Sequence, residues 1–178
     1  MVNLPNFLAL LRVLAAPLMF WFLVDRNNSL FDGWHESWLD YFAALVFVLA
    51  SITDFFDGYI ARQWDQMTKL GAILDPLADK MLMLAGFIGL VYIERASPWA
   101  IFLILSREFF ITGLRVAIAA EGKGVAASFA GKIKTVVQMV AIGFLLMNWP
   151  FATEILWFAV ILTIYSGYEY VKGYFWES

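Results

Sequence analysis

Cysteine is absent from this chain of 178 residues, and charged residues make up only 15% of it. Without cysteine there is no disulfide framework and no thiolate metal site. A soluble domain averages roughly 45–50% apolar and about 25% charged residues, whereas this chain is 62% hydrophobic and 18% aromatic. It also lacks a P-loop and a nucleophilic Ser or Cys arrangement. The composition therefore indicates a membrane protein, and the missing nucleophile argues against a covalent catalytic intermediate.

Six apolar stretches are long enough to cross a bilayer, which takes about 20 residues of helix. They lie at roughly 8–25, 39–62, 72–94, 97–120, 129–148 and 150–173. These runs are long, do not alternate as barrel strands do, and are joined by short connections. The sequence therefore predicts an all-α, polytopic membrane protein, a bundle of six transmembrane helices forming a single domain over residues 1–178. Because Arg12 interrupts the first run, a short N-terminal interfacial helix around Pro5–Leu11 is also allowed.

Basic residues gather in alternate connections, which predicts the orientation of the chain. Lys and Arg mark the cytoplasmic side of membrane proteins. They cluster around 63–71, around 121–134 and in the C-terminal tail, while the opposite connections hold mainly acids. We therefore expect both termini to lie in the cytoplasm. The first residues have no basic segment of the signal-peptide kind, so a cleaved leader is not expected.

Four aspartates interrupt the apolar sequence at helical spacing. Asp54 and Asp57 are three residues apart near the end of the second span, and Asp75 and Asp79 are four apart at the start of the third. Both spacings place a pair on one helix face. The short connection predicts that the two helices are antiparallel neighbours, so four carboxylates would meet at one depth. Hard divalent cations relieve such repulsion, and an all-oxygen set suits Mg²⁺ or Mn²⁺.

The residues beside the first acid pair indicate access for a ligand. Gly58 and Ala61 each follow an aspartate by one turn, which predicts a smooth groove, although small residues also serve close helix packing. Arg62 comes one turn after Gly58, within reach of a phosphate. Further cations in or beside the fourth and fifth spans favour a second anionic substrate, and internal pairing with Glu108 is the alternative. These cations are Arg107, Arg115, Lys132 and Lys134.

The spacing of the acidic segment resembles the signature of the CDP-alcohol phosphatidyltransferase family at all of its fixed positions. They read Asp54-x₂-Asp57-Gly58-x₂-Ala61-Arg62-x₈-Gly71-x₃-Asp75-x₃-Asp79. Two further stretches resemble members that use glycerol 3-phosphate as acceptor, namely Asn3–Asn6 with Arg12, and Arg107–Gln138. Ala9 departs from this pattern, because relatives often carry Thr there, and the departure weakens a hydrogen-bonding role toward the nucleotide at that position.

The resemblance implies transfer of a phosphatidyl group from CDP-diacylglycerol to sn-glycerol 3-phosphate, with release of CMP. It implies two Mg²⁺ or Mn²⁺ ions per active site on Asp54, Asp57, Asp75 and Asp79, with Asp79 also the general base. It places Gly58, Ala61, Arg62, Thr68 and Asn6 at the CDP-diacylglycerol site. It places Arg107, Arg115, Lys132 and Lys134 at the acceptor phosphate. It further implies a homodimer in the bacterial cytoplasmic (inner) membrane, with the active site facing the cytoplasm and no nucleic-acid partner.

Other readings of the same residues remain open. Within the family, the acceptor could instead be inositol phosphate, phosphatidylglycerol or serine, although the basic set favours an acceptor that carries phosphate. A cation transporter also places carboxylates in the membrane, but these acids gather at one face and no inverted repeats are evident. A non-catalytic scaffold would not need the whole signature.

Overall fold

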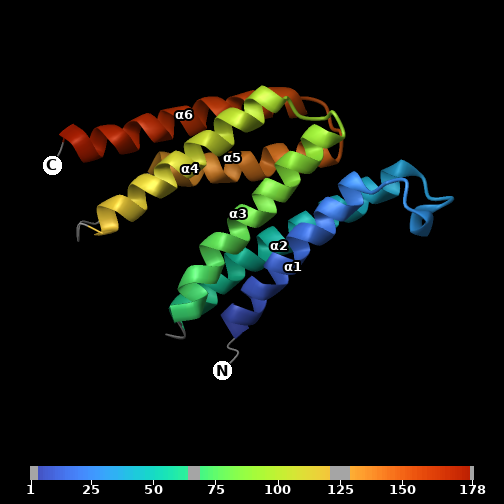
Figure 1. The fold of residues 1–178 in the computed structure, drawn as a ribbon, viewed down its shortest axis with the longest axis horizontal. Coiled ribbons are helices and arrows are strands. Elements are labelled where there is room, and N and C mark those ends of the chain that lie inside the picture. Colours follow the sequence, from blue (N-terminus) through green and yellow to red (C-terminus); the bar gives the residue numbers. More distant parts are fainter. Residues whose placement is uncertain (1–3, 64–68, 121–128, 177–178) are drawn as a thin grey trace. The chain divides into compact units, whose positions relative to one another are not determined.

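The computed structural model describes residues 4–63, 69–120 and 129–176, and every element in these ranges is helical (Figure 1). Side chains at positions 4–6, 54–63, 69–76 and 175–176 belong to described helices but lie outside the described side chains. The chain forms two compact units. Unit 1 is Met1–Arg95 with Leu146–Asn148, and unit 2 is Ala96–Leu145 with Trp149–Ser178.

Unit 1 is built around its first helix. It contains α1 (Leu4–Val24), the short 3₁₀ helix η1 (Ser29–Phe31), α2 (Glu36–Gln63) and α3 (Lys69–Tyr92). α1 packs extensively against both α2 and α3, while α2 and α3 also contact each other to a lesser extent. Gly89 of α3 permits a close approach to α1, because a Cβ there would lie 2.5 Å from Leu23 Cδ1. Small residues let membrane helices approach closely in this way.

The beginning of α1 differs from one possibility that the sequence allowed. A single helix covers Leu4–Val24, with Pro17 inside it, and no separate interfacial helix is present around Pro5–Leu11 within the described residues. Ala9 and Arg12 are both buried, at 0% and 1% exposure. The segment therefore packs into unit 1 as the first turns of α1 instead of lying apart from it.

Asp40 ties together the end of unit 1 that carries η1. Its carboxylate accepts hydrogen bonds from Arg26 and, at 2.5 Å, from Arg95 Nη2. Arg95 Nη1 also donates to the backbone oxygen of Leu146 at 2.8 Å. All three charged side chains are at most 20% exposed. One carboxylate thus joins the start of α2 to the chain segments that follow α1 and α3.

We expect Asp40→Asn to lower the melting temperature of the protein in detergent micelles. Hydrogen bonds to charged groups contribute about 1.5–3 kcal/mol each, and the amide leaves two arginines without their counter-charge. The expected decrease in Tm is about 3–10 °C. Asp32→Asn is the matched control, because Asp32 is an exposed carboxylate in the same connection. Equal melting temperatures for the two variants would show that the Asp40 pairs contribute little.

Unit 2 contains α4 (Pro98–Ala120), most of α5 (Phe129–Leu146) and α6 (Ala152–Trp176). α4 packs against α6. A small apolar core lies at this contact, made of Ile111, Ile118 and Tyr170. Farther along the same two helices lie the polar residues described below.

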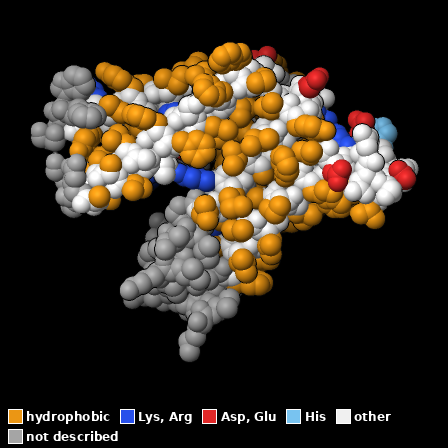
Figure 2. Space-filling model, viewed as in Figure 1, with side chains coloured by type: hydrophobic (Ala, Val, Ile, Leu, Met, Phe, Trp, Pro, Cys, Tyr) orange, Lys and Arg blue, Asp and Glu red, His pale blue; other side chains and the backbone are white. Residues whose placement is uncertain are grey.

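The helices have the length and surface of a polytopic membrane protein. Three stretches of the described residues are long and apolar enough to cross a bilayer, namely Phe7–Val24, Glu36–Thr53 and Phe129–Leu146. Hydrophobic side chains cover most of the described surface that is visible in Figure 2. Many large ones are exposed, including Trp99, Phe109 and Phe151. Lipid is the solvent that accepts such a surface. The protein is therefore an all-α, polytopic membrane protein, as the sequence predicts.

Candidate active site

The backbone places the four aspartates on two helices, as their spacing predicts. Asp54 and Asp57 are one turn apart in α2, and Asp75 and Asp79 are one turn apart in α3. These two helices contact each other. Asp79 is half-buried and follows Ala78, which is fully buried. The helical placement that a shared carboxylate site requires is therefore present in unit 1.

Most of the predicted donor site lies outside the described side chains. This applies to Asp54, Asp57, Gly58, Ala61, Arg62, Asp75 and Asn6, whose backbone is helical, and to Thr68, which lies outside the described residues altogether. Among the described side chains, no group of three or more His, Asp or Glu residues could hold a metal ion. The predicted roles of these residues therefore stay predictions.

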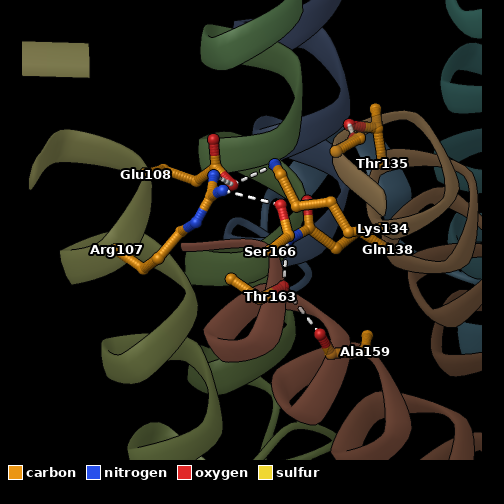
Figure 3. Close-up of polar contacts among 9 residues, drawn as sticks. Arg107, Glu108, Lys134, Thr135, Gln138, Ala159, Thr163 and Ser166 are labelled. Carbon is orange, nitrogen blue, oxygen red and sulfur yellow. Dashed lines mark hydrogen bonds and ion pairs between the residues drawn. The ribbon is translucent and has the colours of Figure 1, made fainter. Parts of the chain in front are cut away.

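Unit 2 brings two of the predicted acceptor cations onto one carboxylate (Figure 3). Arg107 Nη1 donates to Glu108 Oε1 at 3.2 Å, and Lys134 Nζ donates to the same oxygen. The side chains of Arg107 and Lys134 are 12% and 8% exposed, and that of Glu108 is 25% exposed. Arg107 Nη2 also donates to Ser166 Oγ of α6 at 2.8 Å. We call Arg107, Glu108, Lys134 and Ser166 the polar cluster.

One turn after Lys134, a side-chain hydrogen bond joins α5 to α6. Gln138 Nε2 donates to Thr163 Oγ1 at 2.7 Å, and Thr163 Oγ1 donates to the backbone oxygen of Ala159 at 2.6 Å. Gln138 and Thr163 are 2% and 0% exposed. Buried polar groups that are satisfied in this way make a packing arrangement specific. The Gln138–Thr163 hydrogen bond therefore joins α5 to α6 one turn after Lys134.

The other two predicted acceptor cations lie differently. Arg115 is exposed, and its guanidinium carbon lies 5.1 Å from the centre of the Tyr170 ring, a cation–π contact between α4 and α6. Lys132 is exposed at the start of α5. The structure thus joins Arg107 and Lys134 through Glu108, places Arg115 against Tyr170, and leaves Lys132 exposed at the start of α5.

The polar cluster has the chemistry of an anion site. Two cations share one carboxylate, so the three ionised groups carry a net charge of +1. Arginine presents a planar fork of donors that matches phosphate oxygens, and lysine adds a mobile point charge. Charged groups are kept inside an apolar helix bundle at a cost, which makes them candidates for function.

A comparison with known families agrees with the acidic segment. The sequence model of the CDP-alcohol phosphatidyltransferases matches residues 2–165. The chain belongs to the CDP-alcohol phosphatidyltransferase family. The match extends from unit 1 into unit 2 and ends within α6, and it confirms the resemblance that the spacing from Asp54 to Asp79 indicates.

Similar family members come from several bacteria and carry one name. A protein of Bacillus subtilis is 39% identical across 100% of this chain and 97% of its own length, and one of Rickettsia typhi is 39% identical across 97% of each chain. A protein of Escherichia coli K12 is 37% identical across 96% of this chain and 94% of its own. Each is named CDP-diacylglycerol–glycerol-3-phosphate 3-phosphatidyltransferase.

Two parts of the polar cluster of this family member were not assigned from the sequence. The sequence indicates Glu108 only as an ion-pair partner of the cations, although an acid inside an apolar helix is itself a signal of function. Ser166 gave no signal, because small residues are common in membrane helices. Its hydrogen bond to Arg107 spans 59 positions of sequence, so only the packing of α4 against α6 reveals it.

Proposed function

We propose that the protein is a CDP-diacylglycerol–glycerol-3-phosphate 3-phosphatidyltransferase of phospholipid synthesis. It transfers a phosphatidyl group from CDP-diacylglycerol to sn-glycerol 3-phosphate and gives phosphatidylglycerophosphate and CMP. The observation that carries this proposal is the near-complete overlap with relatives of that name at 37–39% identity. The intact acidic signature supports it independently, and so do the largely buried cations Arg107 of α4 and Lys134 of α5.

The four aspartates are the proposed ligands of two Mg²⁺ or Mn²⁺ ions. Their fit rests on the backbone, because each pair lies one turn apart on a helix and the two helices contact each other. Carboxylate oxygens are the ligands that these hard cations prefer. When bound, two such ions would neutralise the charge that develops on the phosphoryl oxygens and on departing CMP.

Asp79 is the proposed general base of a direct displacement. Its carboxylate takes the proton from the C1 hydroxyl of glycerol 3-phosphate while that oxygen attacks the β-phosphorus of CDP-diacylglycerol. The new P–O bond forms as the bond between the β-phosphorus and the CMP oxygen breaks, and CMP leaves. A positioned base contributes about 10²–10⁴-fold to such a step. No side-chain nucleophile is needed, in keeping with the absence of a recognisable nucleophilic arrangement in the sequence.

The remaining predicted residues divide between the two substrates. Toward the donor we assign Gly58, Ala61, Arg62, Thr68 and Asn6. Toward the acceptor phosphate we assign Arg107, Arg115, Lys132 and Lys134. Arg107 and Lys134 are the stronger pair, because their side chains are only 12% and 8% exposed and both already bind one anionic oxygen, that of Glu108. A phosphate oxygen can take the place of that carboxylate oxygen.

The setting of the reaction is also part of the proposal. We place the protein in the bacterial cytoplasmic membrane as a homodimer, with both termini and the active site on the cytoplasmic side. The distribution of Lys and Arg among the connections supports this orientation. Glycerol 3-phosphate is charged and water-soluble, so a site open to the cytoplasm suits it, while the acyl chains of the donor stay in the bilayer.

A different phosphorylated acceptor is the second candidate. The polar cluster fits a phosphate group and says nothing of the alcohol that carries it, so inositol phosphate also satisfies this observation. Serine lacks the phosphate that the two cations of the polar cluster would bind. The names of the relatives favour glycerol 3-phosphate over inositol phosphate.

Transfer by the purified protein tests the function and its metal requirement together. In detergent micelles with CDP-diacylglycerol, radiolabelled glycerol 3-phosphate and Mg²⁺, we expect a labelled lipid and an equal amount of CMP. Excess EDTA should reduce the rate at least about 100-fold, because the paired acids would then repel one another and the phosphates. Added Mg²⁺ or Mn²⁺ should restore it. Unchanged turnover in EDTA would contradict the metal proposal alone, and no labelled lipid in any condition would contradict the function.

A further inference from the structure

Ser166 and Gly167 of α6 form the surface on which the Arg107 side chain packs, and we call these two residues the seat. Ser166 is 1% exposed, and its Oγ accepts a hydrogen bond from Arg107 Nη2 at 2.8 Å. The next residue, Gly167, is also buried. A Cβ built on Gly167 would lie 3.1 Å from both Cγ and Nε of Arg107. Carbon contacts are most favourable at about 3.5–4.0 Å, so the arginine lies across Gly167 more closely than a side chain there would permit.

The guanidinium is held at two of its three nitrogens. Nη1 donates to Glu108 and Nη2 donates to Ser166. Nε is buried and has no hydrogen-bond partner among the residues that the structure describes. A buried donor without a partner costs about 1–3 kcal/mol, so native proteins rarely keep one without a reason. Here the donor lies beside the space that the missing side chain of Gly167 leaves.

Gly167 differs in this respect from other glycines of unit 2. A Cβ on Gly113, Gly143 or Gly173 would meet nothing within 4 Å. Gly173 lies on the same helix as Gly167, almost two turns farther along. Alanine is the better helix former by about 1 kcal/mol. The close approach of Arg107 therefore explains why glycine occupies position 167.

We propose that Ser166 and Gly167 are positioning residues for the acceptor phosphate, an inference that rests on the function proposed above. Ser166 fixes one edge of the guanidinium, and Gly167 lets the rest of the Arg107 side chain lie close against α6, so that together they set the direction in which the guanidinium meets a phosphate. Neither residue touches the substrate, and both act through Arg107. Bidentate binding of phosphate by arginine depends on the orientation of this planar fork.

Two substitutions and a matched control test the inference. Ser166→Ala removes the hydrogen bond at Nη2, and Gly167→Ala places a methyl group against Nε. We expect each to raise KM for glycerol 3-phosphate about tenfold, the effect of one misplaced charged hydrogen bond. The KM for CDP-diacylglycerol should stay within about twofold of the wild type. Gly173→Ala, with its open surroundings, should change neither constant.

A binding measurement separates positioning from packing. Glycerol 3-phosphate should raise the melting temperature of the wild type and of Gly173→Ala in the absence of CDP-diacylglycerol. The same concentration should raise it much less in Ser166→Ala and Gly167→Ala. If the two variants lower kcat and the unliganded Tm but keep the wild-type KM and ligand shift, the seat only packs helices and the inference is wrong. If Gly167→Ala does not fold, Ser166→Ala alone tests the inference, by its KM for glycerol 3-phosphate and its ligand-induced shift in melting temperature.

The role of Ser166 and Gly167 can be disproved while the proposed function stands. Transfer to glycerol 3-phosphate by the wild type, with an unchanged KM in both variants, rejects the seat and keeps the activity. Absence of transfer by the wild type rejects the activity itself. In that case the inference falls with it, since the phosphate that the seat serves would not be a substrate.

Discussion

Asp79→Asn is expected to lower kcat by about 10²–10⁴-fold in a protein that still folds and enters the membrane. The amide has nearly the same shape as the carboxylate but cannot take the proton from the attacking hydroxyl, and a positioned base contributes about this factor. Asp79 lies in α3, one turn after Asp75, and is half-buried. The rate of phosphatidyl transfer at saturating substrates measures the effect.

Two controls accompany this variant. Asp32→Asn removes an exposed carboxylate of the η1 connection and should leave kcat unchanged. Asp79→Asn should still bind CDP-diacylglycerol in part, because three of the four proposed metal ligands remain. Equilibrium dialysis in micelles measures this binding. A wild-type kcat in Asp79→Asn would contradict the assignment of the base and leave the other aspartates as metal ligands.

Arg107→Ala has the second large expected effect, a fall in kcat/KM for glycerol 3-phosphate of about 30- to 4,000-fold. Truncating one member of a buried charge cluster costs about 2–5 kcal/mol, partly because its partners stay buried without it. Arg107 donates to Glu108 and Ser166, and we assign its remaining N–H donors to the acceptor phosphate. Steady-state kinetics with each substrate varied in turn measure the effect.

The substrate dependence distinguishes this role from a general loss of structure. Arg107→Ala should leave the KM for CDP-diacylglycerol within about twofold of the wild type, and Arg107→Lys should recover only part of the loss, because an ammonium lacks the planar fork. Lys172→Ala, which removes an exposed cation of α6, should change neither constant. Equal losses toward both substrates would contradict an acceptor role for Arg107.

The sequence is sufficient to predict the helices of this protein. Long apolar runs with short connections predict each of the six α-helices to within a few residues. The stretch near 97–120 is α4 (Pro98–Ala120), and the stretch near 150–173 is α6 (Ala152–Trp176). This succeeds because long apolar runs favour helices in a bilayer, although only three of the described helices contain a stretch that is both long and apolar enough to cross it. The start of α1 could not be predicted in the same way, since the burial of Arg12 depends on its packing partners.

The candidate site could be predicted only where its residues are close in sequence. The aspartates of each pair are three or four residues apart, so helix geometry alone groups them. The polar cluster combines Arg107, Lys134 and Ser166 from three different helices. Composition identifies the two cations as costly charges, but it does not predict that they share Glu108. The role of Gly167 follows only from its distance to Arg107.

Competition among acceptors tests the central claim most directly. Purified protein is given radiolabelled CDP-diacylglycerol, Mg²⁺ and equal concentrations of glycerol 3-phosphate, inositol phosphate, serine and phosphatidylglycerol, and the labelled lipids are separated and counted. We predict that phosphatidylglycerophosphate makes up nearly all of the product and that one CMP is released for each molecule formed. Another lipid as the main product, or no transfer from CDP-diacylglycerol to any of the four, would contradict the account.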